Sequence, residues 1–232
     1  MVRRAFSLLL ILALAGIFFS ILKGWTPMTE LSGVARDYVA NEKEQLGAMN
    51  LVTAIVVTYR GLDTLGEVTV LFLAASGVAV LLRRKRDEAA ATVKIKRAAS
   101  EIVTTGASLL SPFIVMFGAY IFLNGHLSPG GGFQGGAVIA SAVLLLFLAH
   151  PDYKLKHAVL NIIESFSGFA YVLVGLLGLF LAGGFLDNRF LPLGHFGSLL
   201  SAGAIPVIYV LIGLKVGTEL ATILENMKGR AL

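Results

Sequence analysis

The sequence contains no cysteine, and it has few charged residues for its length. Without cysteine, this chain cannot form disulfides, use a thiolate nucleophile or hold an iron–sulfur cluster through thiolates. Charged residues make up 14% of the 232 residues, whereas a soluble domain has about 25%. Hydrophobic residues make up 56%. A chain this long and this apolar could not bury its hydrophobic surface in water, so it is predicted to be a membrane protein.

Sequence signs of catalysis, of a metal site and of nucleotide binding are also lacking. No Lys follows the glycine-rich stretch, so the phosphate-binding pattern GxxxxGK[ST] is absent, and a dinucleotide fingerprint would need a βαβ context that is missing. His150 and His157 lack metal-ligand spacing, and no Ser/His/Asp set is evident. We therefore expect no catalytic residue, no metal and no cofactor in this chain. The net charge is +5, and the basic residues cluster in short loops between apolar blocks. This pattern favours a membrane orientation signal over a nucleic-acid partner.

Apolar blocks long enough to cross a bilayer predict an all-α integral membrane protein with six transmembrane helices. A cleaved signal peptide would resemble the first block, but its length and the lack of a clear cleavage site favour a retained signal anchor. Residues 47–59 are apolar but too short to span, so we expect a short interfacial or re-entrant helix there. The predicted spans are 5–22, 65–82, 104–123, 132–149, 164–185 and 198–222.

Basic residues set the predicted topology. They gather at the N-terminus, in the 83–97 loop, in the 150–157 loop and in the C-terminal tail. Six spans place all four on one side, so the positive-inside rule predicts that both termini are cytoplasmic in a multi-pass protein of the plasma membrane. The spans fall in a 2+4 arrangement. We define an N-terminal module (1–82), a basic cytoplasmic linker (83–100) and a C-terminal module (101–232).

The most distinctive stretch is NGHLSPGGGFQGG (124–136), with six glycines in 13 residues. Such backbone can approach a neighbour closely, and at membrane depth it must be buried in protein or line a wet cavity. One interpretation is a tight turn with close helix packing, and the other is a stretch that shapes an ion passage with His126 as a titratable member. The residues concerned are Gly125, His126, Pro129, Gly130, Gly131, Gly132, Gln134, Gly135 and Gly136.

A few ionisable residues fall within the predicted spans. Burying such a residue in a span costs a few kcal/mol, so it is usually paired and faces the bundle interior. Lys215 and Glu219 share a helix face, and Glu164, at the predicted start of the fifth span, lies at a similar depth. We expect Lys215 to pair with Glu164, Glu219 or both. The alternative role is a structural ion pair near the interface. The ion-pathway candidates are Asp63, Glu67, His126, Glu164, Lys215 and Glu219.

Three stretches resemble a known family. SPFIVMFGAYIFLNGHLSPGGGFQGG (111–136), ESFSGFAYVLVGLLGL (164–179) and IGLKVGTELATIL (212–224) are similar to the B-type subunit of Mrp-type multisubunit Na⁺/H⁺ antiporters. They are also similar to the equivalent subunit of archaeal membrane-bound hydrogenases and sulfur reductases. NLVTAIVVTYRGLDTLGEVTVLFLAASGV (50–78) resembles the E-type small subunit of those hydrogenases.

The resemblance implies a membrane subunit that helps couple redox chemistry elsewhere to Na⁺ and H⁺ movement, in a hydrogenase or sulfane reductase complex. It implies antiporter-like membrane partners, hydrogenase-like or sulfur-reductase-like peripheral partners, and NiFe or iron–sulfur centres only in those partners. It also places Glu67, in DTLGE, in or near an ion route. Two alternatives remain: a subunit of a stand-alone Mrp-type antiporter, and a purely structural scaffold.

Overall fold

The computed structural model is described for residues 2–25, 30–31, 33–88 and 99–231, which form helices and loops without any strand. Two compact units divide the chain, Met1–Asp37 and Tyr38–Leu232. The first unit holds α1 (Val2–Gly24), whose side chains from Arg4 onward are exposed. The predicted linker at 83–100 falls mostly outside the described residues, and its first six residues continue a helix.

The described residues contain six helices that are long and apolar enough to cross a membrane, which confirms the all-α fold with six spans. The short helix expected at 47–59 is present as α3 (Leu51–Ala54), which continues into a π-helical turn (Ile55–Tyr59). It is not among the six spans. The other helices are α2 (Gly33–Gln45), α4 (Gly61–Glu88), α5 (Glu101–Leu123), α6 (Gly132–Ala149), α7 (His157–Ala182) and α8 (Ile205–Ala231).

Two spans begin about two helical turns from their predicted starts, while the other four begin within about one turn of theirs. The fifth span starts at His157, so Glu164 lies two turns inside α7 and not at its start. The sixth begins at Ile205, because Ala202 (φ 66°) and Gly203 (φ 57°) adopt left-handed backbone that a helix cannot contain. Pro206 consequently falls in the first turn of α8, where proline needs no helical N–H partner, and not in mid-span.

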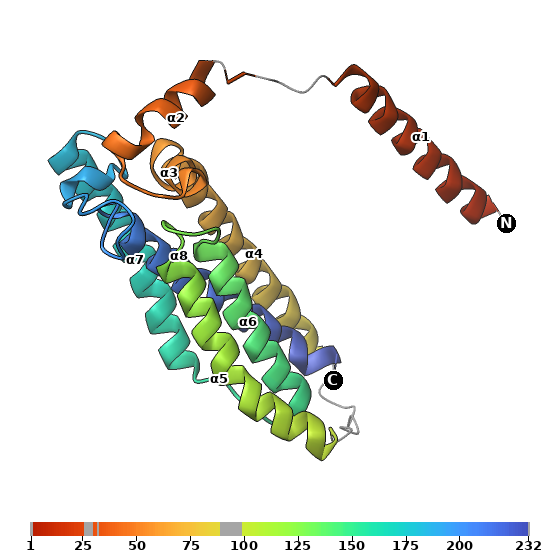
Figure 1. Ribbon diagram of the computed structural model, residues 1–232. Helices are drawn as coiled ribbons and strands as arrows, with labels where there is room; N and C mark the ends of the chain where they lie inside the picture. The colour runs from red at the N-terminus through yellow and green to blue at the C-terminus, as the bar shows by residue number, and fades with distance from the viewer. Residues whose placement is uncertain (1, 26–29, 32, 89–98, 232) are drawn as a thin grey trace. The chain divides into compact units, whose positions relative to one another are not determined.

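Within the second unit, α8 is the central helix, and α4, α6 and α7 pack against it while α5 packs mainly on α6 (Figure 1). The buried core accordingly lies along α8 and includes Ile205, Ile208 and Ile212. We call the end of this bundle that carries residues 124–131 the glycine-loop end; the 150–156 turn lies at the opposite end.

Glycines allow α6 to approach both of its neighbours closely. A Cβ on Gly135 would lie 2.5 Å from the carbonyl oxygen of Gly118 in α5, and a Cβ on Gly136 would lie 2.9 Å from the carbonyl oxygen of Gly213 in α8. Both separations are far below van der Waals contact, so the two helix pairs depend on glycine at these positions. Close helix packing through small residues is the usual way for helices to associate in a membrane.

Candidate ion-pathway site

Lys215 and Glu219 form an ion pair in the middle of the central helix. Lys215 Nζ lies 2.6 Å from Glu219 Oε1, and the two residues are 9% and 0% exposed. The i, i+4 spacing on α8 places both side chains on one face, so the expected pairing of Lys215 with Glu219 is present. The second carboxylate oxygen of Glu219, Oε2, has no hydrogen-bond partner among the described residues.

The ammonium of Lys215 lies between α4 and α7. Its Nζ lies 5.0 Å from the ring centroid of Phe72 on α4, within cation–π range. It also lies 3.5 Å from where a Cβ on Gly168 of α7 would stand. The charge pair is therefore enclosed by three helices, and Lys215 contacts the element on each side of α8.

Glu164 supplies a second carboxylate near this pair. It is half-buried on α7 and lies within electrostatic range of Glu219, but it makes no ion pair with Lys215. The expected cluster of Glu164, Lys215 and Glu219 is thus brought together, with the direct ion pair confined to α8.

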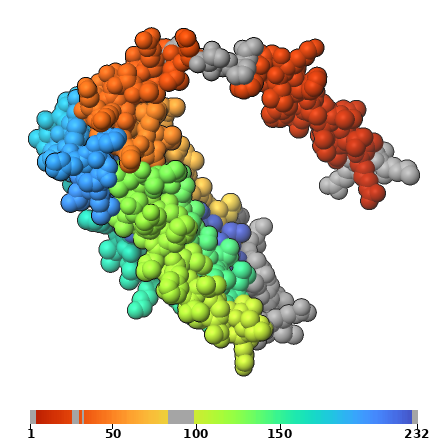
Figure 2. Space-filling model, viewed as in Figure 1, coloured from red at the N-terminus to blue at the C-terminus, as the bar shows by residue number. Residues whose placement is uncertain are grey.

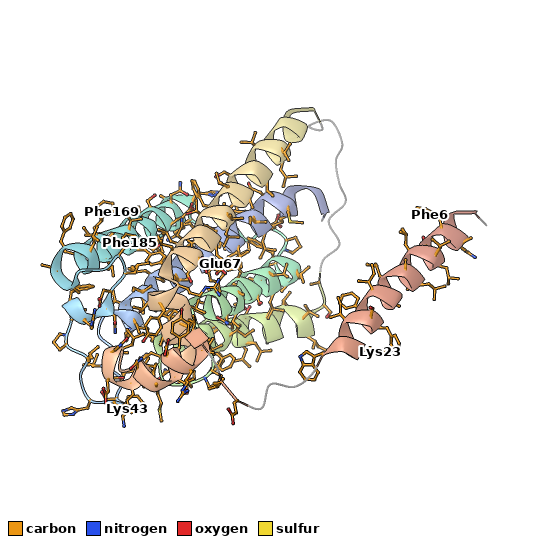
Figure 3. All side chains as sticks on the ribbon, turned by 90° about the horizontal axis from the view of Figure 1, so that it is seen from above. Phe6, Lys23, Lys43, Glu67, Phe169 and Phe185 are labelled. Carbon is orange, nitrogen blue, oxygen red and sulfur yellow. The ribbon has the colours of Figure 1, made fainter. Side chains whose placement is uncertain are left out.

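Glu67 lies nearer the glycine-loop end, on the exposed surface of α4 (Figure 3). It is the seventh residue of α4, about 9 Å along the helix from its start. It lies within electrostatic range of Tyr171 of α7, which is 1% exposed and whose hydroxyl has no hydrogen-bond partner among the described residues. We call the set formed by Glu67, Tyr171, Lys215, Glu219 and Glu164 the polar track.

Asp63 does not join the polar track. It lies in the first turn of α4 and is exposed, and its Oδ2 accepts a hydrogen bond of 2.6 Å from Arg60 Nε. An exposed ion pair of this kind contributes little stability. Asp63 therefore pairs with its neighbour Arg60 at the end of the span.

Residues 50–53 dock onto the glycine-rich stretch. Asn50 Nδ2 donates to the carbonyl oxygens of Gly125 and Ser128, each at 2.9 Å, and Thr53 Oγ1 donates to Gly125 at 2.6 Å. Tyr209 of α8 donates to Thr53 Oγ1 at 3.1 Å. Gly131 and Gly132 are buried and Gly130 is half-buried, while Pro129 and Gln134 are exposed.

A second asparagine makes the reciprocal contact. Asn188, in the loop between α7 and α8, is fully buried, and its Nδ2 donates to the carbonyl oxygens of Leu46 (3.0 Å) and Ala202 (2.9 Å). Asn50 also caps α3 through its side chain. We call Asn50 and Asn188 the two clamp asparagines. The sequence predictions missed both, because a single Asn in a loop carries no periodic signal, although Asn50 directly precedes an apolar helical stretch as a cap would.

His126 lies at the centre of this docking region and is fully buried. Its carbonyl oxygen accepts a hydrogen bond of 3.0 Å from the Asn50 N–H. Backbone groups of Ser198 and Leu199 lie near the imidazole ring and raise its pKa slightly. Neither ring nitrogen makes a hydrogen bond of standard geometry with any described residue. Burial lowers the pKa of His126 below its usual range.

The docking region is therefore expected to weaken in acid. An unfolded histidine gains its proton near pH 6.5, and the folded ring resists it, so stability present above about pH 6.5 is lost as the pH falls toward the lower folded pKa. The loss is at most about 1.4 kcal/mol per pH unit for one proton. Thermal unfolding at about pH 7.5 and about pH 5.5 should show this loss in the natural protein and a reduced loss in His126→Leu. His195→Leu, at an exposed position, is the control; equal pH dependence in all three proteins would contradict the assignment.

Two family models together match almost the whole chain. Residues 102–222 match the domain related to the MnhB subunit of Na⁺/H⁺ antiporter, and residues 2–99 match the E-type subunit of MBH. The junction between the two matches, at residues 100–101, lies at the C-terminal end of the predicted linker at 83–100.

Related sequences and solved structures agree with these models. An uncharacterised protein of Methanocaldococcus jannaschii is 30% identical over 196 residues, which are 75% of this chain and 74% of that protein. The B-type subunit of a Na⁺/H⁺ antiporter of Bacillus subtilis is 38% identical over 76 residues, covering 33% of this chain and 52% of that protein.

Among solved structures, a chain of an archaeal membrane-bound sulfane sulfur reductase superposes with a TM-score of 0.84 at 45% identity, over 98% of both chains. A chain of the Mrp complex of Dietzia sp. superposes with a TM-score of 0.78 at 25% identity, over 99% of this chain and 26% of that one. The chain belongs to the family of membrane domains related to the MnhB subunit of Na⁺/H⁺ antiporters.

Proposed function

We propose that this chain is a membrane subunit of a multisubunit Na⁺/H⁺-translocating module within a respiratory complex of the sulfane sulfur reductase or membrane-bound hydrogenase type. The polar track is the observation that carries the proposal. The two-part match, to an MnhB-related domain and to the E-type subunit of MBH, supports the choice of complex over a stand-alone antiporter. So does the full-length likeness to a chain of the sulfane sulfur reductase.

The charges of the track suit a site that exchanges a cation. Glu164 and Glu219 are two carboxylates beside the single ammonium of Lys215. If all three groups are ionised, one negative charge stays uncompensated, and such a charge within a membrane is costly. A proton or a Na⁺ ion neutralises it, and Oε2 of Glu219 has no competing partner among the described residues. Reversible neutralisation of this kind is what a translocation site needs, because the ion must also leave.

Glu67 would connect this cluster to a neighbouring chain. A carboxylate on the exposed surface of a span is stable only if it faces a wet cavity or a partner protein. We infer that an antiporter-like membrane protein covers Glu67 and completes the ion route there. In this arrangement the redox centres lie in peripheral partner proteins, the complex resides in the plasma membrane, and both termini of this chain are cytoplasmic.

The replacement Glu67→Gln tests the proposal. It keeps the size of the side chain and removes its charge, so we expect Na⁺-dependent H⁺ movement in vesicles containing the assembled complex to fall at least about tenfold, a barrier increase of about 1.4 kcal/mol. Assembly, measured by native gel electrophoresis and mass spectrometry of the component chains, should be unchanged. Glu101→Gln is the matched control, because Glu101 is an exposed glutamate at the first residue of α5.

Two results would overturn the proposal in different ways. Transport that survives Glu67→Gln would remove Glu67 from the route. Loss of assembly in Glu67→Gln, with Glu101→Gln intact, would favour a structural scaffold whose charges hold the component chains together.

A further inference from the structure

A pair of titratable side chains lies outside the polar track, at the end of the bundle opposite the glycine loop. His157 is the first residue of α7, and its Nε2 lies 3.4 Å from Oε2 of Glu225, in the last two turns of α8. The side chain of His157 is 63% exposed, and that of Glu225 is 15% exposed. Water therefore reaches the imidazole, while the carboxylate lies further inward.

This pair continues the polar track to the end of the bundle. α7 and α8 run antiparallel (Figure 1). From His157 to Glu164 α7 rises about 10.5 Å, and from Glu225 to Glu219 α8 rises about 9 Å, so Glu164 and Glu219 lie at matching depth and within electrostatic range. Lys215 follows one turn further along α8. Titratable groups therefore occur at successive levels between α7 and α8, from the surface to the middle of the bundle.

Two threonines fill the intervals on α8. Thr222 lies midway between Glu225 and Glu219, and Thr218 lies one turn before Thr222. Each hydroxyl donates to a carbonyl oxygen of its own helix at 2.9 Å, and each keeps lone pairs on its oxygen that can accept a proton. Residues three and four apart share a helix face, so Lys215, both threonines and both glutamates form one polar stripe along α8.

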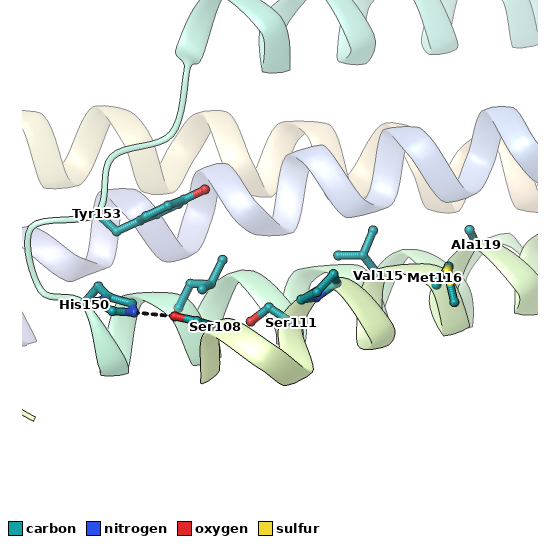
Figure 4. A pocket seen from close by; sticks show the side chains of 9 residues that line it. Ser108, Ser111, Val115, Met116, Ala119, His150 and Tyr153 are labelled. Carbon is teal, nitrogen blue, oxygen red and sulfur yellow. Dashed lines mark hydrogen bonds between the residues drawn. The ribbon is translucent and has the colours of Figure 1, made fainter. Parts of the chain in front are cut away.

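Neighbouring polar groups at this end bind elsewhere. His150 Nε2 lies 3.1 Å from Ser108 Oγ of α5 (Figure 4), and α5 forms one outer face of the bundle (Figure 2). Lys228 donates to the carbonyl oxygen of Tyr153. Among the described residues, Glu225 is thus the carboxylate that pairs with His157. The remaining charged side chains of the turn are exposed: Asp152, Lys154 and Lys156.

The chemistry of the pair suits a proton better than Na⁺. Oε1 of Glu225 already accepts a hydrogen bond of 3.3 Å from the Leu155 N–H. Oε2 faces an imidazole nitrogen, and imidazole takes up and releases protons near neutral pH. When a proton moves from Nε2 of the imidazolium to Oε2 of the carboxylate, an N–H bond breaks, an O–H bond forms and both groups become neutral. A Na⁺ ion would find a single available carboxylate oxygen there, whereas ion sites use several oxygens.

We propose that His157 and Glu225 are the proton entrance of the polar track. A proton binds at the exposed imidazole of His157, passes to Glu225 and reaches Glu219 along the threonine hydroxyls of α8. The inference rests on the proposed function and adds a path to it. Protons reach Glu219 from the end opposite the glycine loop, without passing Glu67.

The replacement Glu225→Gln tests the entrance in vesicles that contain the assembled complex. The amide keeps an oxygen for the Leu155 N–H but carries no transferable proton, so H⁺-coupled exchange of radioactive Na⁺ should fall at least about tenfold while assembly is unchanged. His157→Gln should have the same effect. The matched controls are Glu101→Gln and His150→Gln, at the same end of the bundle, and both should exchange Na⁺ normally.

Chemical rescue separates a proton-transfer role from a structural one. With equal pH on the two sides of the vesicle, added imidazole creates no pH gradient and supplies a mobile proton carrier. It should restore much of the exchange in His157→Gln. A loss that imidazole does not relieve would overturn the proposal and assign the pair to holding the 150–156 turn on α8.

The variant Glu67→Gln distinguishes failure of the entrance from failure of the proposed function. Normal exchange in Glu225→Gln and His157→Gln, with Glu67→Gln inactive, would remove the entrance and leave the function standing. Normal exchange in all three variants would contradict the function as well.

Discussion

Replacing Lys215 by methionine is expected to lower the free energy of unfolding by about 3–5 kcal/mol, because it leaves the fully buried carboxylate of Glu219 without its counter-charge. Methionine keeps an unbranched apolar stem, so the change removes the ammonium, its ion pair with Glu219 and its cation–π contact with Phe72. The double variant Lys215→Met/Glu219→Gln removes both charges and should recover much of the loss. Chemical unfolding of the purified protein in detergent, followed by circular dichroism, measures both.

A third variant separates this effect from a general loss of positive charge. Lys154→Met removes a lysine from an exposed turn and should change the unfolding free energy by less than about 1 kcal/mol. If the single and double variants at Lys215 are equally destabilised, the coupling between Lys215 and Glu219 is absent. Both should lose transport, since the proposed site needs its charges and stability alone would not restore it.

The second large effect is expected at Gly118, where α5 meets α6. A Cβ there would lie 2.7 Å from the carbonyl oxygen of Gly135 and 2.7 Å from Ile139 Cγ1. Backbone atoms cannot move aside as a flexible side chain can, so Gly118→Ala must push the two helices apart, at a cost of about 1–3 kcal/mol. Unfolding in sodium dodecyl sulfate measures the change.

Gly106 provides the matched control on the same helix. A Cβ at Gly106 meets nothing within 4 Å, and alanine is the better helix former. We therefore expect Gly106→Ala to be neutral or slightly stabilising. Equal stability of the two alanine variants would mean that α5 and α6 are farther apart than the structure has them.

The spans could be predicted from sequence because hydrophobic length alone determines them, and α6 matches its predicted range of 132–149. The start of α8 could not. Residues 198–204 read SLLSAGA and are apolar enough to extend the span, but Ala202 and Gly203 take left-handed backbone that sequence hydropathy does not encode. The start of α7 was missed because Glu164 was interpreted as the boundary charge of the span, whereas apolar residues continue back toward His157.

In the candidate site, contacts within one helix could be predicted from the sequence, whereas contacts between helices could not. The pairing of Lys215 with Glu219 follows from helical spacing, which fixes neighbours within one helix. The position of Glu67 beside Tyr171, and the docking of Asn50 on residues 125–128, depend on which helices pack together. No local pattern specifies such packing, and the role of the glycine-rich stretch in docking became evident only from the contacts of its carbonyl oxygens. The directions of the termini and the ion-route residues stay predictions.

The two clamp asparagines have a consequence for how the two halves of this protein can diverge. Their four acceptors are the main-chain oxygens of Leu46, Gly125, Ser128 and Ala202. Every amino acid offers that oxygen, so the bonds themselves do not specify the side chains at Leu46 and Ser128. Gly125 is restricted separately, because a Cβ there would lie 2.6 Å from Tyr209 Cδ2, and Ala202 is restricted by its left-handed backbone. The halves could then be encoded as one gene or as two and still recognise each other through Asn50 and Asn188. Where the two halves meet, we expect Asn50 and Asn188 to be among the residues that are substituted most slowly.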